Sequence, residues 1–405
     1  MDIELANHMW DTFKNSGPSD VSERVQHDSR GPIRGLWPNF EIHGLINRTA
    51  ITTKSLAAQR AFGAYGEGIT WAVVDSGIEA NHSHFARHSN LGLPGSPLSH
   101  RSFVGGSVAD ALTDKAGHGT HVAGIIAGED TGVLIARNHI VDDKDLRVRQ
   151  EKVAAVSGMA PKCSLLSLKV LRSDGSGDLV ALIKALQFLR QLLQEHDGEL
   201  PVHGVNLSVG YPFDPSWFGT GQTPVCREVD ALVRAGLVVV AAAGNTGCGM
   251  ARGFGPRASS FQMGVGQTIN DPGNAEAAIT VGSTSASPYH TGVSYFSSKG
   301  PTGDGRPKPD LVAPGERVVS AAAGKLWEEL GPPSTRTPYA ENSGTSMAAP
   351  HVSGVAAAFL SVHRGFIGRT GEVKRILLGS AVDLGRSRDF QGNGLVDTMS
   401  AIQSV

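Results

Sequence analysis

The stretch SLLSLKVL (164–171) is a short apolar run of the length and composition of one buried strand. After a polar turn, the chain enters the strongest helical pattern in the sequence. Its apolar residues recur at the spacing of one helical face: Leu179, Leu182, Ile183, Leu186 and Leu193. A buried strand followed by an amphipathic helix is the repeating unit of a parallel sheet, so this stretch points to an α/β fold.

Similar apolar runs occur four more times along the chain. They are ITWAVV (69–74), VHGVNLS (202–208), LVVVAAAG (237–244) and AAITVG (277–282). Helical patterns follow at 121–128, near 226–235, and in the Ala-rich and EVKRILLGS segments that close the chain. The alternation predicts a mainly parallel sheet covered by helices on both faces. Functional sites in such sheets gather outside the carboxyl ends of the strands.

Composition sets limits on the class of protein. The chain has 405 residues, 40% of them hydrophobic and 18% charged, which is enough to bury a large core. A formal net charge of -2 and a pI near 6.7 give no bulk attraction to nucleic acid or to an anionic membrane. No apolar run approaches the roughly 20 residues that span a bilayer. We therefore expect neither nucleic-acid nor membrane partners, and the oligomeric state stays open.

The N-terminus and the cysteines bear on location. MDIELANHMWDTFKNSG has acids where a signal peptide has bases, and it lacks an apolar core. The three cysteines, Cys163, Cys226 and Cys248, cannot all pair with one another, and CxxC spacing is absent. Both features favour a cytoplasmic location, and a secreted protein whose signal has been removed is the alternative.

The polar breakers NSGPSD and DSRGPIRG lie within residues 1–55. They predict an N-terminal extension without a core of its own. Residues 56–405 carry the strands and helices and are expected to form one large domain.

Three residues at the ends of predicted elements form a possible catalytic set. Asp75 follows ITWAVV, His118 lies in GHGTHVAG before a helix, and Ser346 precedes an apolar helix. Singly, each fits a turn, capping or packing role. Together they supply what a serine nucleophile needs, a base and an acceptor that orients the base. His351, five residues after the serine, is not one helical turn away and is expected to be a helix residue.

Asn245 follows a strand of small residues in AAAGNTG. It fits a simple turn, or it is a side-chain amide that donates to an oxyanion. Ser346 at a helix N-terminus gains from free N–H groups that favour negative charge. Gly344 permits close backbone approach beside the serine.

The motifs VVDSGI, GHGTHVAG, AAAGN and GTSMAAPHVSG, in that order, resemble the signatures of the subtilisin-like serine proteases over roughly residues 60–405. The resemblance implies a three-layer fold with a mostly parallel, seven-stranded sheet. It implies that Asp75 orients the base, His118 is the general base and acid, and Ser346 is the nucleophile. Asn245 and the Ser346 backbone N–H would form the oxyanion hole. Protein or peptide is the implied substrate, and the chemistry needs no cofactor.

The resemblance also implies which residues bind substrate. The segment 173–178 matches an edge strand that pairs with the substrate backbone, and the segments 207–210 and 241–244 match the strands that flank the specificity pocket. The implied residues are Leu171, Gly175, Ser176, Gly177, Ser208, Val209, Gly210, Ala242, Ala243, Gly244, Gly344 and Thr345.

The sequence departs from the family where many relatives bind a tight calcium ion. His84 stands at the position of a ligating acid, and an insertion at 129–158 replaces the Asn-rich loop. We therefore expect the usual calcium site to be absent. Asp142, Asp143 and Asp145 make either another calcium site or a solvated charge run. HSHFARH (82–88) is expected to serve packing and polar roles rather than to bind a metal.

A second insertion, 246–274, follows the oxyanion asparagine where the family builds the floor of its main pocket. Asp271 within it is either a selector of basic side chains or a solvated loop acid. Cys248 is either a thiol that makes the enzyme sensitive to modification or inert. Intracellular relatives carry a short extension over the active site, and GLWPNFEIHGLINR (35–48) has the apolar anchors for that role. Residues 1–55 are therefore a candidate inhibitor, making the chain a zymogen.

The expected activity is that of a serine endopeptidase. One alternative on the same fold is a peptide macrocyclase or transamidase, because cyclising members carry inserted capping helices and 129–158 is an insertion. Another is a non-catalytic peptide-binding scaffold, although binding alone needs none of Asp75, His118, Ser346 and Asn245.

Overall fold

The computed structural model describes residues 48–405, apart from 94–95, 97, 143–144, 196–199, 213, 215–219, 253–259 and 335. The chain divides into two units, 1–45 and 46–405, and only the second falls within the described residues. The predicted extension, including 35–47, therefore lies outside what the structure describes. The remaining residues of 1–55 include helix α3 (Arg48–Thr52) and the start of α4 (Ser55–Phe62).

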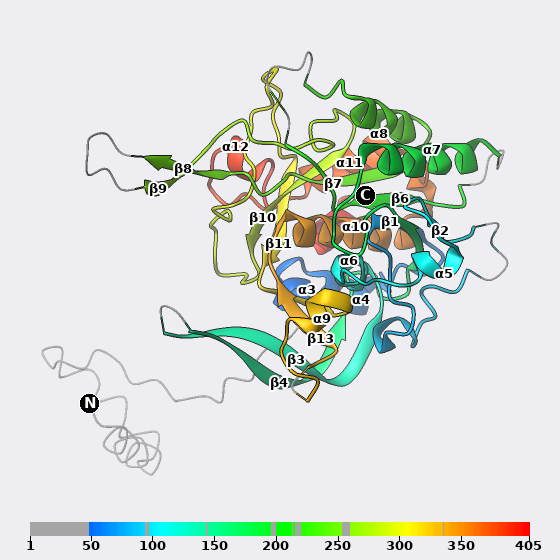
Figure 1. Cartoon of the computed structure of the whole chain (residues 1–405). Helices are drawn as coiled ribbons and strands as arrows, with labels where there is room; N and C mark the ends of the chain where they lie inside the picture. The colour runs from blue at the N-terminus through cyan, green and yellow to red at the C-terminus, as the bar shows by residue number, and fades with distance from the viewer. Residues whose placement is uncertain are drawn as a thin grey trace, which may run out of the picture. The chain divides into compact units, whose positions relative to one another are not determined.

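A seven-stranded, all-parallel sheet forms the centre of the described unit, in the order β11-β10-β7-β6-β1-β5-β2 (Figure 1). Its strands are β1 (Thr70–Asp75), β2 (Arg101–Ser102), β5 (Ser164–Lys169), β6 (Gly204–Leu207), β7 (Val238–Ala242), β10 (Ile279–Ser285) and β11 (Leu311–Glu316). The predicted parallel sheet is confirmed, and each apolar run named above contributes one strand.

Both faces of the sheet are buried. Successive side chains of one strand point to opposite faces, so each strand contributes residues to two apolar clusters. In β1, Trp71 and Val73 pack in one apolar cluster, and Ala72 and Val74 pack in another. The first cluster is completed by helices α6 (His118–Ile126), α10 (Thr345–Val362), α11 (Thr370–Gly379) and α13 (Thr398–Gln403). The second is completed by α7 (Leu179–Glu195) and α8 (Pro224–Arg234). The predicted three-layer α/β architecture is therefore confirmed.

Helix α10 crosses the sheet and begins with the candidate nucleophile. It is the one helix among the described residues that is long and apolar enough to span a bilayer, and 83% of that window is buried inside the protein. Its apolar character therefore belongs to the core. Pro350 is the sixth residue of α10 and cannot donate to the Ser346 carbonyl oxygen, which instead accepts from Ser208 Oγ at 2.9 Å.

The insertion at 129–158 is a long β-hairpin. It does not form the inserted capping helices on which the macrocyclase alternative was based. Its strands, β3 (Glu129–Asp142) and β4 (Asp145–Ser157), extend a small sheet in the order β12-β13-β3-β4. Strand β12 spans Val318–Ala321 and β13 spans Tyr339–Asn342. Ile135, Val153 and Val156 pack with Tyr339 to attach the hairpin to the body. The side chains of Asp142, Asp143 and Asp145 lie outside the described part of the chain.

The second insertion forms another hairpin, β8 (Cys248–Arg252) and β9 (Ser260–Gly264), which projects from the body in Figure 1. At the start of the described chain, Thr53, Ser55 and Thr398 are joined by hydrogen bonds, and Lys54 pairs with Asp397. The predicted boundary at residue 56 thus falls inside a packed region. The remaining short helices are η1 (Ser83–Phe85), α5 (Val108–Ala111), α9 (Gly324–Glu328), η2 (Arg364–Phe366) and α12 (Arg388–Gln391).

Candidate active site

Asp75 is the last residue of β1, at the carboxyl edge of the sheet, and it is 1% exposed. Its Oδ1 accepts hydrogen bonds from His118 Nδ1 at 2.7 Å and from the Ser76 backbone N–H at 2.7 Å. A buried carboxylate bonded to Nδ1 fixes the imidazole tautomer and leaves Nε2 for a reaction partner.

His118 is the first residue of α6, and a neighbouring acid fixes the start of that helix. Asp114 Oδ1 accepts from the Gly117 N–H at 2.8 Å, and Oδ2 accepts from the Thr120 N–H at 2.8 Å. Ser76 Oγ donates to Asp114 and accepts from the Gly119 N–H, both at 2.9 Å. Asp114 therefore ties the start of α6 to the turn after β1. Our sequence reasoning missed it, although an acid four residues before the base was a visible capping signal.

Glycine at position 119 is required by a close approach of α6 to the loop after β1. A Cβ placed there would lie 2.2 Å from the Gly77 carbonyl oxygen and 3.1 Å from the Asp75 Cβ. The motif GHGTHVAG thus includes a residue chosen for backbone contact, and that contact sets the distance between the helix and Asp75.

The charges around His118 favour its protonated form. Burial opposes protonation, but the Asp75 charge, its hydrogen bond and the Asp114 charge outweigh it, so the pKa of His118 lies above 6.5. The side chain keeps 29% of its surface exposed and lines the cavity described below. The imidazole is therefore accessible and tuned to accept a proton.

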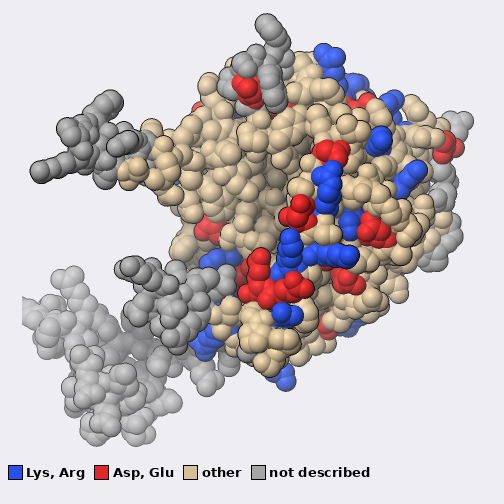
Figure 2. Space-filling model, in the orientation of Figure 1, with Lys and Arg blue, Asp and Glu red and all other residues tan. Residues whose placement is uncertain are grey.

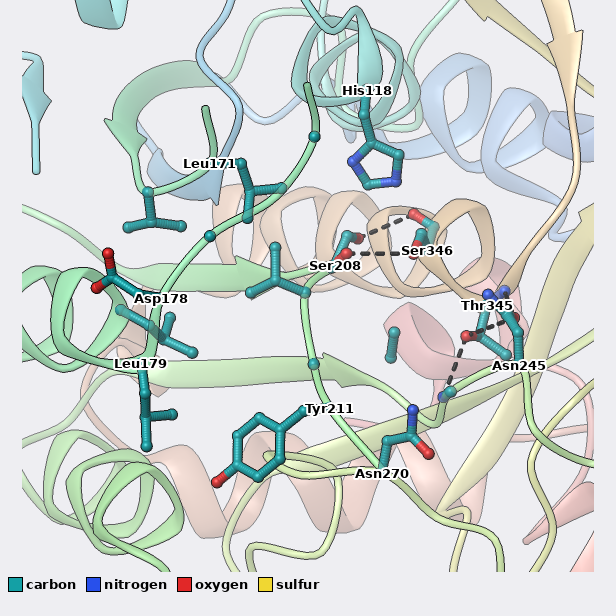
Figure 3. A pocket seen from close by; sticks show the side chains of 18 of the residues that line it. His118, Leu171, Asp178, Leu179, Ser208, Tyr211, Asn245, Asn270, Thr345 and Ser346 are labelled. Atoms are coloured by element: carbon teal, nitrogen blue, oxygen red, sulfur yellow. Dashed lines mark hydrogen bonds between the residues drawn. The ribbon is translucent and has the colours of Figure 1, made fainter. Parts of the chain in front are cut away.

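Ser346 is the second residue of α10, so Gly344 and not the serine is the N-cap residue. Its hydroxyl donates to the Ser208 carbonyl oxygen at 3.2 Å, and Ser208 Oγ donates to the Ser346 carbonyl oxygen at 2.9 Å (Figure 3). The His118 ring extends from α6 toward Ser346 in the same view. In this state the hydroxyl is bonded to a carbonyl, and the structure shows no hydrogen bond between it and His118 Nε2. Such loose geometry is common before substrate binds.

Thr345 orients the Asn245 side chain. Asn245 Oδ1 accepts from the Thr345 N–H at 2.9 Å and from Thr345 Oγ1 at 3.1 Å. With the oxygen held there, the amide nitrogen is turned toward Gly344, where an added Cβ would lie 3.5 Å from Nδ2. The amide N–H groups thus face the space beside the serine, as an oxyanion donor requires.

These side chains open on one cavity of about 670 Å³. Nine residues with an implied binding role line it, namely Leu171, Gly175, Gly177, Ser208, Val209, Gly210, Ala242, Gly244 and Thr345. Ser176, Ala243 and Gly344 do not. The sequence analysis did not expect Val170 and Tyr211 to line the cavity, and it assigned Leu179 and Leu182 only to a helix. It did not single out Asp178, Thr246 and Asn270, although they lie in the segment 173–178 and the insertion 246–274 that it placed near the substrate. Loop residues such as Tyr211 carry no periodic signal that would have marked them.

Asp271 is not a solvated loop acid, since it is fully buried. Its carboxylate accepts from Thr223 Oγ1 at 2.6 Å and from Asn274 Nδ2 at 2.8 Å. Its backbone pairs with that of Tyr211. The residue lies behind the wall of the cavity and does not line it, so the expectation of a solvated acid is wrong. The structure also gives no support to Asp271 as a selector of basic side chains.

Of the three histidines at 82–88, His82 and His84 pack against aromatic rings and His88 pairs with Glu129. His84 is fully buried, with Nε2 3.0 Å from the Gly124 carbonyl oxygen and Nδ1 3.2 Å from the Tyr339 hydroxyl. Burial, with a smaller effect from His82, lowers the pKa of His84 to about 4. A neutral imidazole is no ligand for calcium, which binds oxygen, so this position does not fit the family's ion. Among the described residues, no group of three or more His, Cys, Asp or Glu is arranged to hold a metal.

His351 is buried in α10, where Nδ1 donates to the Met347 carbonyl oxygen at 2.8 Å. It is a helix residue, as predicted. On the face seen in Figure 2, acidic and basic side chains lie side by side, with no continuous area of either sign. This mixture fits the small net charge of -2.

Comparison with known proteins identifies the family. A sequence profile of the Subtilase family, Peptidase S8, matches residues 66–394. Subtilisin DY of Bacillus licheniformis is 31% identical over 346 residues, which are 85% of this chain and 94% of that protein. Serine protease AprX of Bacillus subtilis is 30% identical over 336 residues, 81% of this chain but only 65% of AprX. Subtilisin E of Bacillus subtilis is 30% identical over 341 residues, 84% of this chain and 67% of that protein. The chain therefore belongs to the Subtilase family, Peptidase S8.

Proposed function

We propose that the protein is a serine endopeptidase that hydrolyses peptide bonds through an acyl-enzyme intermediate. The observation that carries the proposal is that His118, Ser346 and Asn245 line one cavity, while buried Asp75 holds His118 from behind. The Asp75–His118 hydrogen bond is 2.7 Å long, and Thr345 orients the Asn245 amide. A serine, a base, an acid that orients the base and an oxyanion donor are together the requirements for acyl transfer.

In the proposed reaction, Ser346 Oγ attacks the scissile carbonyl carbon and passes its proton to His118 Nε2. Asp75 stabilises the resulting imidazolium through Nδ1. The carbonyl oxygen, now negative, accepts hydrogen bonds from Asn245 Nδ2 and from the Ser346 backbone N–H. His118 then gives its proton to the leaving amine, and the acyl group stays on Ser346.

Deacylation repeats these steps with water as the nucleophile. His118 takes a proton from the water, the hydroxide attacks the ester carbonyl, and Ser346 regains its proton as it leaves. The segment 173–178 is the proposed backbone-pairing edge for an extended peptide, and it begins in a turn that is closed by an isolated bridge between Leu171 and Gly177.

Labelling with a fluorophosphonate probe and peptide cleavage read by mass spectrometry test the proposal together. We expect the probe to label Ser346 in the wild type and not in Ser346→Ala, and we expect products whose summed mass exceeds the substrate by one water. If the serine is labelled but the products include a cyclic peptide and their summed mass equals that of the substrate, the protein is a macrocyclase instead. An unlabelled serine and an intact peptide that still binds would show a scaffold.

We also propose that the domain does not need the calcium ion that many relatives bind, because buried His84 stands where an oxygen ligand is required. The thermal midpoint of the full chain is expected to be the same in excess EGTA as in millimolar calcium. Subtilisin DY, treated in parallel, shows whether the assay can detect calcium stabilisation. A midpoint that falls in EGTA would show that the chain has a calcium site of its own.

A further inference from the structure

The cavity has two walls that diverge from the candidate nucleophile. One wall runs from Ser208, whose carbonyl oxygen accepts from Ser346 Oγ, to Tyr211. The other follows β7 and includes Ala242, Gly244 and Thr246. The backbones of Tyr211 and Asp271 pair at the far end of the first wall, with both N···O distances 3.0 Å. A side chain that enters between the walls therefore runs toward the residue just before Asp271.

That residue is Asn270, and its backbone is fixed to the second wall. Its N–H donates to the Ala243 carbonyl oxygen at 2.9 Å. Its side chain lies against Gly244, where an added Cβ would be only 2.5 Å from the Asn270 Cγ. Figure 3 shows the amide between Tyr211 and Asn245, facing the space below Ser346. Asn270 thus joins the two walls at the end of the cavity away from the serine.

One end of this amide is held and the other is open to the cavity. Oδ1 lies 3.0 Å from Thr246 Oγ1, whose one proton it shares with the Thr268 carbonyl oxygen at the same distance, whereas the structure shows no hydrogen bond from Nδ2 to any described residue. A primary amide carries both donors and an acceptor, so it can pair with a neutral group that itself donates and accepts. The half-buried Asn270 side chain is therefore a polar group available to a ligand.

Near the Asn270 amide, the residues that line the cavity include no charged side chain. The titratable residues among those lining the cavity are His118, Asp178 and Tyr211. Asp178 is at the opposite end, where it pairs with Arg172 at 2.7 Å and accepts from the Ala181 N–H of α7. The Tyr211 hydroxyl lies 3.5 Å from Asp271 Oδ2, behind the wall. A charged side chain placed near Asn270 would lose water and meet no opposite charge.

We propose that Asn270 is a specificity-determining residue for the residue before the scissile bond (P1). It selects a long, uncharged side chain that ends in a group able to donate and accept a hydrogen bond, namely tyrosine or glutamine. This inference rests on the proposed peptidase function. Phenylalanine and methionine fill similar volumes but leave the amide unpaired, which is the basis for discrimination.

Peptide substrates that differ only at P1 test the proposal. For the wild type, we expect kcat/KM to be about 5- to 10-fold higher for P1 Tyr than for Phe, and for Gln than for Met, as one neutral hydrogen bond provides. In Asn270→Leu, which keeps the volume and removes the amide, both ratios should fall to about 1. A merely structural role would lower all four values together and leave the ratios unchanged.

Two further variants sharpen the result. Tyr289→Phe removes the hydroxyl of an exposed side chain that does not line the cavity, so the P1 ratios should stay at the wild-type values. Asn270→Asp places a carboxylate at the same point. The ratio of kcat/KM for P1 Lys to kcat/KM for P1 Gln should then rise at least 10-fold above that of the wild type. If the Lys-to-Gln ratio does not rise, the side chain at 270 does not reach P1, and the proposal is wrong.

The failure of this proposal differs from a failure of the peptidase function. Fluorophosphonate labelling of Ser346 is measured for every variant alongside cleavage. Labelling and hydrolysis with wild-type Tyr-to-Phe and Gln-to-Met ratios near 1 would overturn the role of Asn270 alone. Absence of both labelling and cleavage in the wild type would overturn the peptidase function on which it rests.

Discussion

Single residues next to the reacting groups set their orientation, and Thr345 is the clearest case. Its N–H and hydroxyl both donate to Asn245 Oδ1, and the hydroxyl also accepts from the Gly244 N–H at 3.1 Å. Thr345→Val keeps the shape of the side chain and the hydrogen bond from the backbone N–H to Asn245 Oδ1, and it removes the hydrogen bond from the hydroxyl. We expect kcat to fall about 5- to 10-fold with little change in KM, because the amide acts only on the developing oxyanion.

Two companion variants calibrate that result. Thr345→Ser restores the hydroxyl and should recover most of kcat. Asn245→Ala removes the donor altogether and should cost about 10²- to 10³-fold in kcat, the magnitude found for such a donor in subtilisin. A Thr345→Val enzyme with wild-type kcat would show that the backbone N–H alone positions the amide.

The protonation of His118 sets the acid side of the activity profile. A general base works when it is neutral, and the carboxylates of Asp75 and Asp114 hold the pKa of His118 above 6.5 despite its burial. We therefore expect kcat/KM for an uncharged peptide to rise with pH through a midpoint above 6.5. A midpoint below 6.5 would show that burial, which favours the neutral imidazole, outweighs the two acids.

At the scale of elements, the inserted hairpin β3–β4 is attached through charge as well as apolar packing. Arg137 on β3 lies 2.8 Å from Glu341 Oε1 and 2.9 Å from Glu151 Oε2. The Glu341 side chain is 2% exposed and lies on β13, which leads directly to Ser346. Arg137→Met should lower the free energy of unfolding by about 2 kcal/mol, because it takes the less exposed of two arginines, Arg137 and Arg317, from a buried carboxylate.

Arg149→Met is the matched control for the hairpin. Arg149 lies opposite Arg137 on β4, but its side chain is exposed. Its loss should change stability by less than about 0.5 kcal/mol. Denaturant unfolding of the two variants checks the difference. Equal stabilities would mean that the apolar contacts of Ile135, Val153 and Val156 attach the hairpin without help from Arg137.

The elements also show where sequence reasoning succeeded and why it stopped. Runs such as 164–171 predicted central strands because a strand buried on both faces must be apolar throughout. The hairpin at 129–158 was not predicted, because its strands are charged and its core-facing residues, such as Ile135, Val153 and Val156, form no continuous apolar run. Asp75, His118, Ser346 and Asn245 were predicted from the roles that acyl transfer needs. Asp114, Tyr211 and Asn270 were missed because their roles depend on contacts between distant loops.

For the molecule as a whole, buried histidines couple stability to pH. His84, His121 and His351 are fully buried, and burial lowers their pKa values from 6.5 to about 4, 3 and 4. Below pH 6.5 the unfolded chain binds protons at these residues and the folded protein does not. Stability is therefore complete above pH 6.5 and is lost as the pH falls from 6.5 toward 4. Each histidine with a pKa of about 4 contributes on the order of 2 kcal/mol of this loss by pH 5.

His351→Leu isolates one of these contributions. His351 makes one hydrogen bond to its own helix, and Nε2 has no partner among the described residues, so leucine fits at modest cost near pH 7. Unfolding free energies from pH 7.5 to 4.5 should show a shallower decline for His351→Leu than for the wild type. The exposed His290, changed to Gln, serves as the control and should leave the decline as it is. A His351→Leu curve parallel to that of the wild type would mean that His351 accepts its proton without unfolding. The acid sensitivity of the fold would then arise from its other buried groups.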